Sequence, residues 1–95
     1  MRTPEGKVKD KVVKILKQYG VYYFFPVTGG LGMSGIPDII CCHNGRFIAI
    51  ECKAGKNKTT ALQDAHLARI RAAGGVAVVI NEENVNGLAE TIGCE

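Results

Sequence analysis

The dipeptide Asn44-Gly45 constrains the fold of this sequence more than any other feature. It stands between two apolar runs, residues 37–43 and 46–53, and this arrangement is the strongest short signal for a β-hairpin. Both central residues of a type I′ turn need a positive φ angle, which asparagine and glycine adopt more readily than other residues. The sequence therefore predicts two antiparallel strands joined by a two-residue turn.

This turn also fixes the register of the predicted hairpin. It pairs His43 with Arg46, and continuing outward along both strands places Asp38 opposite Glu51. Directly opposed residues of an antiparallel pair lie about 4.5–5.5 Å apart, and like charges there are destabilising. Two carboxylates so placed either share a proton or bind a cation. Lys53 lies two residues beyond Glu51 and hence on the same face of the strand.

A simpler interpretation of these charges stays open. The hairpin would then present an exposed face on which Lys53 merely neutralises Glu51, and a β-bulge would change the register. Glu5 bears on this choice, because it shares a helix face with Val8 and Val12, which are expected to point inward. The alternative for Glu5 is an acid that is favoured at a helix N-terminus by the helix dipole.

The whole chain predicts an α/β domain with the element order α-β-β-β-α-β-α. Thr3-Pro4 begins the first helix and Gly20 ends it. A helix between the third and fourth strands implies that these two strands are parallel, in one mixed four-stranded sheet. The predicted elements are a helix over 3–20, strands over 21–25, 37–43, 46–53 and 76–80, a helix over 60–73 and a short helix over 85–92.

The second predicted helix carries both a packing pattern and a capping pattern. Its apolar stripe is expected to consist of Leu62, His66, Ile70 and Ala73. His66 is therefore interpreted as a hydrogen-bonded core residue and not as a base. Thr60 and Gln63 have the spacing of a capping box, which gives Gln63 a structural role at the start of the helix.

Composition places the chain among folded globular domains. Its 95 residues are 46% hydrophobic and 22% charged, which fits one domain over residues 1–95 and excludes a disordered chain. No apolar run approaches the ~20 residues of a membrane span, and the N-terminus lacks the apolar core of a signal peptide. The formal net charge of +3 permits a polyanionic partner without requiring one.

The four cysteines are Cys41, Cys42, Cys52 and Cys94. Two of them are adjacent, and no Cys-x-x-Cys occurs. We interpret them as buried free thiols of a protein in the reducing cytoplasm, with a zinc site or disulfides as the alternative.

The segment Ile36-Pro37-Asp38, followed by Glu51-Cys52-Lys53 thirteen residues after Asp38, resembles the PD-(D/E)xK nuclease signature. The predicted element order resembles the restriction-endonuclease-like core of that superfamily. Within it, the chain most resembles the stand-alone VRR-NUC (virus-type replication-repair nuclease) domain, through residues 35–38, the Glu-x-Lys and the glutamine Gln63. Archaeal Holliday junction resolvases have a similar layout, with a glutamate in the first helix and a serine in the glycine loop.

The resemblance implies a Mg²⁺- or Mn²⁺-dependent, structure-selective DNA endonuclease of DNA repair that hydrolyses phosphodiester bonds. Its implied substrates are four-way (Holliday) junctions or related branched DNA. The implied metal ligands are Glu5 (directly or through water), Asp38, Glu51 and the backbone carbonyl of Cys52. Lys53 would orient the attacking water or stabilise the transition state, and Gln63 would lie near Lys53 and position it.

Nucleic-acid contacts are expected from one loop and two lysines. The glycine-rich segment 28–35 is either a flexible connection or a DNA-contacting loop, in which Ser34 and the bare backbone of Gly35 approach the sugar-phosphate chain. Lys56 and Lys58 flank the acidic residues and would bind phosphates.

A homodimer is the expected assembly, because cutting both strands of a branched substrate needs two active sites. No organic cofactor and no membrane contact are expected. Two other functions stay open: a catalytically silent nucleic-acid-binding module of the same fold, and a small interaction or redox protein that uses its thiols.

Overall fold

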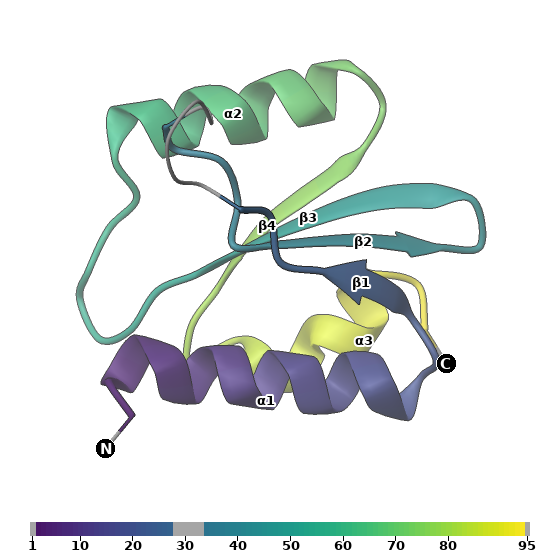
Figure 1. The fold of residues 1–95 in the computed structure, drawn as a ribbon, viewed down its shortest axis with the longest axis horizontal. Coiled ribbons are helices and arrows are strands. Elements are labelled where there is room, and N and C mark those ends of the chain that lie inside the picture. Colours follow the sequence, from purple (N-terminus) through teal and green to yellow (C-terminus); the bar gives the residue numbers. More distant parts are fainter. Residues whose placement is uncertain (1, 28–33, 95) are drawn as a thin grey trace.

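The computed structural model describes residues 2–27 and 34–94 and shows helices on both faces of one four-stranded sheet (Figure 1). The elements are α1 (Pro4–Gln18), β1 (Tyr22–Phe24), β2 (Ile39–His43), β3 (Arg46–Cys52), α2 (Ala61–Ala72), β4 (Val76–Ile80), the 3₁₀ turn η1 (Val85–Gly87) and α3 (Leu88–Thr91). This order confirms the predicted α-β-β-β-α-β-α arrangement. No helix in the described part of the chain is both long and apolar enough to cross a membrane.

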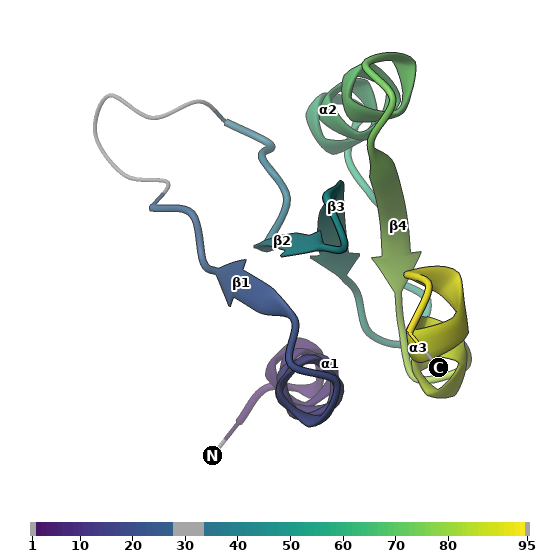
Figure 2. The same ribbon diagram turned by 90° about the vertical axis from the view of Figure 1, so that its right-hand side faces the viewer.

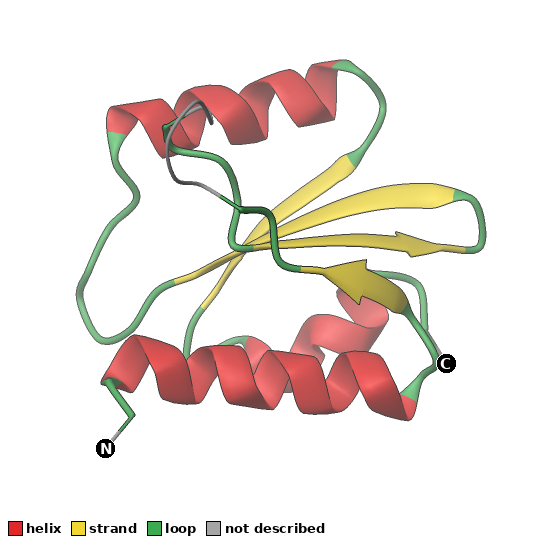
Figure 3. Ribbon diagram, viewed as in Figure 1, coloured by secondary structure: helices red, strands yellow, loops and turns green. Residues whose placement is uncertain are grey.

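The sheet has the strand order β1-β2-β3-β4 and is mixed, as predicted. The first three strands form an antiparallel meander, whereas β4 pairs in parallel with β3. The parallel pair requires a crossover connection, and α2 supplies it. Figure 3 shows the result, with α1 and α3 on one side of the sheet and α2 on the other.

The β2–β3 hairpin has the turn and the register that its sequence predicts. Asn44 and Gly45 have φ angles of 52° and 78°, as a type I′ turn requires. His43 pairs with Arg46, and the ladder continues without a bulge to Ile39 opposite Ile50. The next positions outward are those of the two acids, so the hairpin brings them to the same end of the sheet.

Helix α1 begins and packs as its sequence indicates. The Thr3 hydroxyl accepts a hydrogen bond from the Gly6 amide at 3.0 Å, which caps the helix. Val8, Val12 and Leu16 are buried against the sheet and the C-terminal helical segment. The predicted inward-facing stripe of α1 is therefore confirmed at these residues, and Glu5 lies one turn before Val8 on the same side of the helix.

Helix α2 covers the opposite face of the sheet but turns a different side inward from the predicted one. Leu67 is its buried residue and packs with Ala49 and Ala77 of the sheet. Leu62, in contrast, is 58% exposed, so the predicted apolar stripe is wrong at this position, and also at Ala73, which is exposed. The two alanines on the sheet leave room for Leu67, and the inward stripe accordingly runs through positions 63, 67 and 70.

The cysteines are free thiols, of which three are buried. Cys41, Cys52 and Cys94 lie in the core, whereas Cys42 is exposed, so the prediction of burial is wrong for Cys42. Cys42 points to the α2 face of the sheet, at a place that α2 does not cover. Burial raises the pKa of Cys41 to about 11 and that of Cys52 to about 12, so both thiols stay protonated at neutral pH.

Candidate active site

Two acids lie at the end of the β2–β3 hairpin that is remote from the Asn44-Gly45 turn. Asp38 immediately precedes β2, and Glu51 is the penultimate residue of β3. The amide of Cys52 donates to Oδ2 of Asp38 at 2.8 Å, which fixes the orientation of that carboxylate. The predicted juxtaposition of Asp38 and Glu51 is therefore supported by the observed register and by this contact.

Glu51 is buried, and its two oxygens have different surroundings. The side chain is 2% exposed, and Oε2 accepts a hydrogen bond from Nε2 of Gln63 at 3.0 Å. The ammonium of Lys53 lies 3.6 Å from the same oxygen. Oε1 is buried as well, but it has no hydrogen-bond partner among the described residues. A buried carboxylate oxygen without a donor is costly and marks a place where a cation would be stabilising.

The electrostatics of Glu51 point the same way. Burial, followed by the negative charge of Asp38, raises the pKa of Glu51 to about 7, and the Lys53 ammonium only partly opposes this. The negative charge of Glu5 raises the pKa of Glu51 further. The site thus holds more negative charge than its own lysine compensates.

Gln63 has the predicted capping role and also contacts Glu51, whereas its expected role of positioning Lys53 stays a prediction. Its Oε1 accepts from the amide of Thr60 at 2.9 Å, and the Thr60 hydroxyl accepts from the Gln63 amide at 3.2 Å, which completes the capping box. Since Oε1 is used by the cap, Nε2 is directed at Glu51. The structure therefore places Gln63 against Glu51, with Lys53 near the same carboxylate oxygen. Within the described part of the chain, Gln63 and Lys53 form no hydrogen bond with each other.

Lys53 extends the strand that carries Glu51. Its amide donates to the carbonyl of Ile80 at 2.9 Å, so the parallel pairing with β4 continues to this residue. Its side chain is 14% exposed and lies on the same face as Glu51, as predicted. The Lys53 ammonium therefore lies beside the buried carboxylate of Glu51 and partly offsets its negative charge.

The backbone of Cys52 faces the acids, while its thiol lies in the core on the other face of the sheet. Because Lys53 pairs with β4, the neighbouring peptide groups of Cys52 point toward β2. The observed pairing ends at Ile39 and Ile50, and continuing this register two positions would place Pro37 opposite Cys52. Pro37 has no amide hydrogen to donate, so it cannot form a ladder hydrogen bond with the carbonyl of Cys52, and the role of that carbonyl as a metal ligand stays a prediction.

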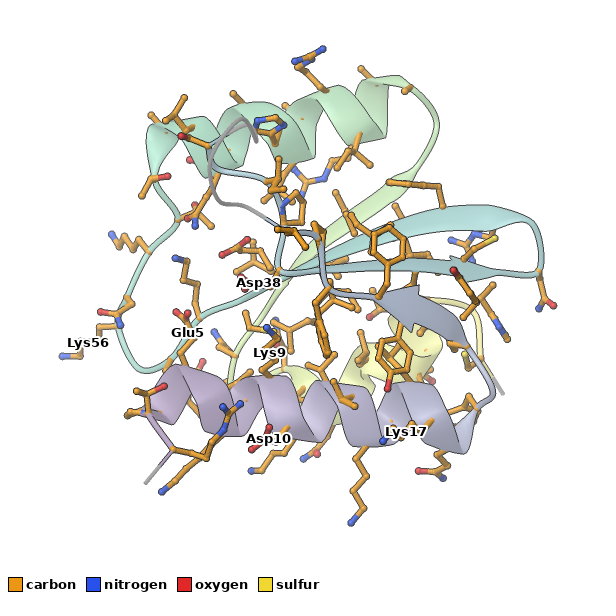
Figure 4. The ribbon with its side chains drawn as sticks, in the orientation of Figure 1. Glu5, Lys9, Asp10, Lys17, Asp38 and Lys56 are labelled. Carbon is orange, nitrogen blue, oxygen red and sulfur yellow. The ribbon has the colours of Figure 1, made fainter. Side chains whose placement is uncertain are left out.

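Glu5 approaches these residues from α1. Figure 4 shows it projecting from the first turn of the helix on the side where Asp38 lies. Across residues 2–27 and 34–94, however, no three His, Cys, Asp or Glu side chains come close enough to hold a metal ion together. In the described part of the chain, Glu5 therefore does not lie close enough to Asp38 and Glu51 to bind one metal ion directly with them. Binding of Glu5 to the metal through a water molecule stays a prediction.

The predicted nucleic-acid contacts lie around this site. Lys56 and Lys58 are exposed on the loop after β3, and Figure 4 shows Lys56 pointing away from the protein. Ser34 is exposed, whereas Gly35 is half-buried with φ +79°, and a Cβ there would lie 2.7 Å from Cβ of Leu62. The close approach that needs glycine is thus to α2, and the DNA contacts of these four residues stay predictions. Residues 28–33 of the same loop lie outside the described residues.

Glu82 was missed by the sequence analysis. It follows β4, and both of its carboxylate oxygens lie 3.0 Å from the amide of Gly55, which donates to them. The backbone amide of Glu82 itself, followed by that of Gly55, lowers the pKa of the Glu82 carboxyl. The contact ties the lysine-bearing loop after β3 to the end of the neighbouring strand. No periodicity in the sequence signals it, because it joins two loops.

The donor set fits a divalent metal ion. Among the described residues, the site offers a buried carboxylate oxygen without a partner and a second carboxylate held by one oxygen, with the backbone carbonyl of Cys52 between the two strands. Mg²⁺ prefers oxygen ligands in an octahedral arrangement and usually keeps several waters. Two carboxylates and one carbonyl leave positions for those waters and for a substrate oxygen.

Comparison with known proteins agrees with this architecture. No protein-family profile matches the chain. A solved structure of a VRR_NUC domain superimposes with a TM-score of 0.75 and 24% identity, over 94% of this chain and 97% of that one. The chain has the VRR_NUC fold. The resemblance to the VRR_NUC domain that the motifs predicted is thereby confirmed, together with the restriction-endonuclease-like fold class.

Two further proteins are similar to this VRR_NUC-like chain. Hjc of Archaeoglobus fulgidus, a Holliday junction resolvase, superimposes with a TM-score of 0.60 and 22% identity, over 79% of this chain and 65% of that one. The protein named "Putative nuclease p44", from Acyrthosiphon pisum secondary endosymbiont phage 1, is 29% identical over 85 residues, which are 88% of each protein.

Proposed function

We propose that this protein is a Mg²⁺- or Mn²⁺-dependent endonuclease that hydrolyses DNA phosphodiester bonds. The observation that carries the proposal is Glu51, a buried carboxylate beside Asp38 whose Oε1 has no partner among the described residues. A protein that only binds nucleic acid has no need to bury an uncompensated acid next to another one. The similarity to a nuclease and to a junction resolvase supports the same chemistry.

Asp38, Glu51 and the carbonyl of Cys52 would hold the metal, with Glu5 contributing through water. When bound, the ion supplies Lewis-acid activation of the phosphate and a lower pKa for an attacking water. Lys53 would orient that water or stabilise the additional negative charge of the transition state through its ammonium. Gln63 donates to Oε2 of Glu51, so Oε1, which has no partner among the described residues, is the oxygen that would bind the metal.

Branched DNA, including four-way junctions, is the substrate that we propose. Support comes from the similarity to Hjc, whose name states that it is a Holliday junction resolvase. Lys56 and Lys58 are exposed on a loop that Glu82 holds next to the site, where they would bind phosphates. Each such contact would steepen the slope of the logarithm of the binding constant against the logarithm of the salt concentration by about 0.9 for duplex DNA.

A homodimer is the proposed assembly, formed through the part of the α2 face of the sheet that α2 leaves uncovered. We define this uncovered sheet face by Tyr22, Phe24, Cys42 and Phe47. All four are exposed, and the pairings Tyr22–Cys42 and Cys42–Phe47 align three of them across the strands. A hollow of about 430 Å³ adjoins Phe47 and would receive a side chain of the second copy. Figure 2 shows β1 extending away from α2, which lies over β4.

The test is a panel of fluorescently labelled four-way, flap, duplex and single-stranded DNAs incubated with Mg²⁺, Mn²⁺, Ca²⁺ or EDTA. The wild-type protein should cut branched DNA in Mg²⁺ or Mn²⁺ and leave all substrates intact in EDTA. Asp38→Asn and Glu51→Gln should each lower the rate by at least about a thousandfold, since they remove metal ligands. The matched control is Glu90→Gln, an exposed acid on α3, which should cut at the wild-type rate.

Two results would contradict the proposal. Cleavage by Asp38→Asn at the wild-type rate would show that the acids do not carry the chemistry. Tight binding of branched DNA without cleavage in any metal would identify the protein as a silent binding module of the same fold.

A further inference from the structure

A second hollow lies between α1 and the residue that follows β1. It has a volume of about 370 Å³ and is lined by Arg2, Lys9, Asp10, Val13 and Phe25. Nothing in the candidate active site uses it. Two cations and an exposed aromatic ring in one hollow are the combination with which proteins bind the phosphate and the base of an unpaired nucleotide.

The two cations of this hollow differ in whether an acid neutralises them. Arg2 forms a salt bridge with Asp10 at 2.9 Å and also donates to the carbonyl of Gly6, so its charge is already neutralised. Lys9 forms no salt bridge with a carboxylate among residues 2–27 and 34–94. Its ammonium lies 4.4 Å from the centroid of the Phe25 ring. The hollow therefore has a net positive charge, and that charge belongs to Lys9.

Phe25 holds Lys9 in place and still presents a surface. A cation over the face of an aromatic ring is attracted by the ring quadrupole, which fixes the direction of the lysine side chain. Phe25 nevertheless stays 47% exposed, and Tyr23 packs against it edge to face with the ring centroids 5.8 Å apart. Tyr23 thus holds the Phe25 ring in place, and part of the ring stays exposed to solvent.

The hollow lies on the same helix as Glu5 of the candidate active site. Lys9 lies one turn after Glu5, and residues four apart in a helix lie on the same face. Figure 4 shows Lys9 projecting from α1 toward the side of Asp38, whereas Lys17 lies at the far end of the helix.

We propose that this hollow binds an unpaired nucleotide of the DNA strand next to the scissile phosphate, with Lys9 on its phosphate and Phe25 against its base. The position relative to the scissile phosphate rests on the proposed nuclease function. A base inside a duplex cannot reach an aromatic ring on the protein surface, so the site selects strands with unpaired nucleotides, such as those at a branch.

The test measures binding in EDTA, where no cleavage occurs. A short fluorescein-labelled thymidine oligonucleotide is titrated with wild-type protein at several salt concentrations, and fluorescence anisotropy gives the affinity. The salt slope is the slope of the logarithm of the binding constant against the logarithm of the salt concentration. Lys9→Gln should make this slope shallower by about 0.7, the value for one phosphate contact on a single strand. Phe25→Leu should weaken binding about tenfold, because stacking is lost, and should leave the salt slope unchanged.

Two variants control for nonspecific effects. Lys9→Arg keeps the charge and should restore the wild-type salt slope, which a merely structural role of Lys9 would not predict. Lys17→Gln removes an exposed lysine of the same helix and should leave both slope and affinity unchanged. Wild-type affinity and slope in Lys9→Gln, or an equal loss in Lys17→Gln, would overturn the proposal.

The outcome is separable from that of the nuclease test. If the protein binds the oligonucleotide through Lys9 and Phe25 but cuts nothing, the nucleotide site stands and the proposed function fails. If it cuts branched DNA while Lys9→Gln and Phe25→Leu bind as the wild type does, the nuclease stands and the nucleotide site fails.

Discussion

At the scale of single residues, the site depends on how the two oxygens of Glu51 are treated. Gln63 and Lys53 both act on Oε2, and neither reaches Oε1. The capping box explains this division, because it uses the oxygen of the Gln63 amide and leaves only the nitrogen for Glu51. The start of α2 and the orientation of the buried acid are therefore set by the same side chain.

The first prediction concerns the pH dependence of stability without metal. The pKa of Glu51 is raised from 4.5 to about 7 in the folded protein. Between these values the folded state holds a proton that the unfolded state has released, so the free energy of unfolding falls as the pH rises through this window. Urea unfolding in EDTA at several pH values measures the effect. Glu51→Gln cannot titrate at this position and should remove the decrease, and an unchanged decrease in this variant would assign it to another group.

The second prediction separates the two roles of Gln63. Thr60→Ala breaks the capping box but does not touch Glu51, and it should cost about 1 kcal/mol of stability while cleavage stays near the wild-type rate. Gln63→Ala breaks the same box and also frees Oε2 of Glu51. It should therefore lower cleavage about tenfold or more, as the loss of a residue that orients a metal ligand does. Urea unfolding and single-turnover cleavage measure both, and equal rates in the two variants would leave Gln63 with the cap alone.

At the scale of elements, the sequence predicted the structure best where a single local feature, the two-residue turn, decides the pairing of the strands. Asn44-Gly45 predicted the turn, the register and hence the meeting of Asp38 and Glu51, because a two-residue turn allows only one pairing. The inward side of α2 was not predictable in this way. Leu62 has a core-like side chain, but the helix is oriented by Gln63 against Glu51 and by Leu67 over small residues of the sheet. Those partners come from other elements, so helical periodicity alone does not reveal them.

The third prediction compares two glycines that both have positive φ. Gly45 has φ +78° and no atom near its missing side chain, so Gly45→Ala should cost about 1–2 kcal/mol through backbone strain alone. Gly35 has φ +79°, and its added Cβ would also clash with Cβ and the backbone carbon of Leu62. Gly35→Ala should therefore cost about 2–4 kcal/mol and displace the N-terminus of α2. Chemical unfolding measures both, and equal losses would show that the loop does not pack on α2 in solution.

At the scale of the whole molecule, the two faces of the sheet are covered unequally. Helices α1 and α3 bury the face that contains Ile39, Ile48 and Ile50, all of which have no exposed surface. On the other face α2 covers β3 and β4, while Tyr22 and Phe47 stay 68% and 48% exposed. The sequence showed that the strand over 21–25 is aromatic, but it gave no means to tell which rings face solvent, since that depends on where α2 lies across the sheet.

The last prediction tests the uncovered sheet face as a dimer interface. If two copies associate there, light scattering of the wild-type protein at micromolar concentration should give about twice the 10.2 kDa of one chain. Phe47→Lys should give the monomer mass, because an isologous interface places the introduced charge in the contact twice. Asn86→Lys adds the same charge on η1, beyond the opposite face of the sheet, and should stay dimeric. Monomeric Phe47→Lys should still bind Mn²⁺, since each proposed site is built within one chain.

On a four-way junction, this monomeric variant should nick one strand at a time, whereas the wild type should make paired cuts. A wild-type protein that is monomeric at this concentration would exclude the interface, and paired cutting would then need a different explanation.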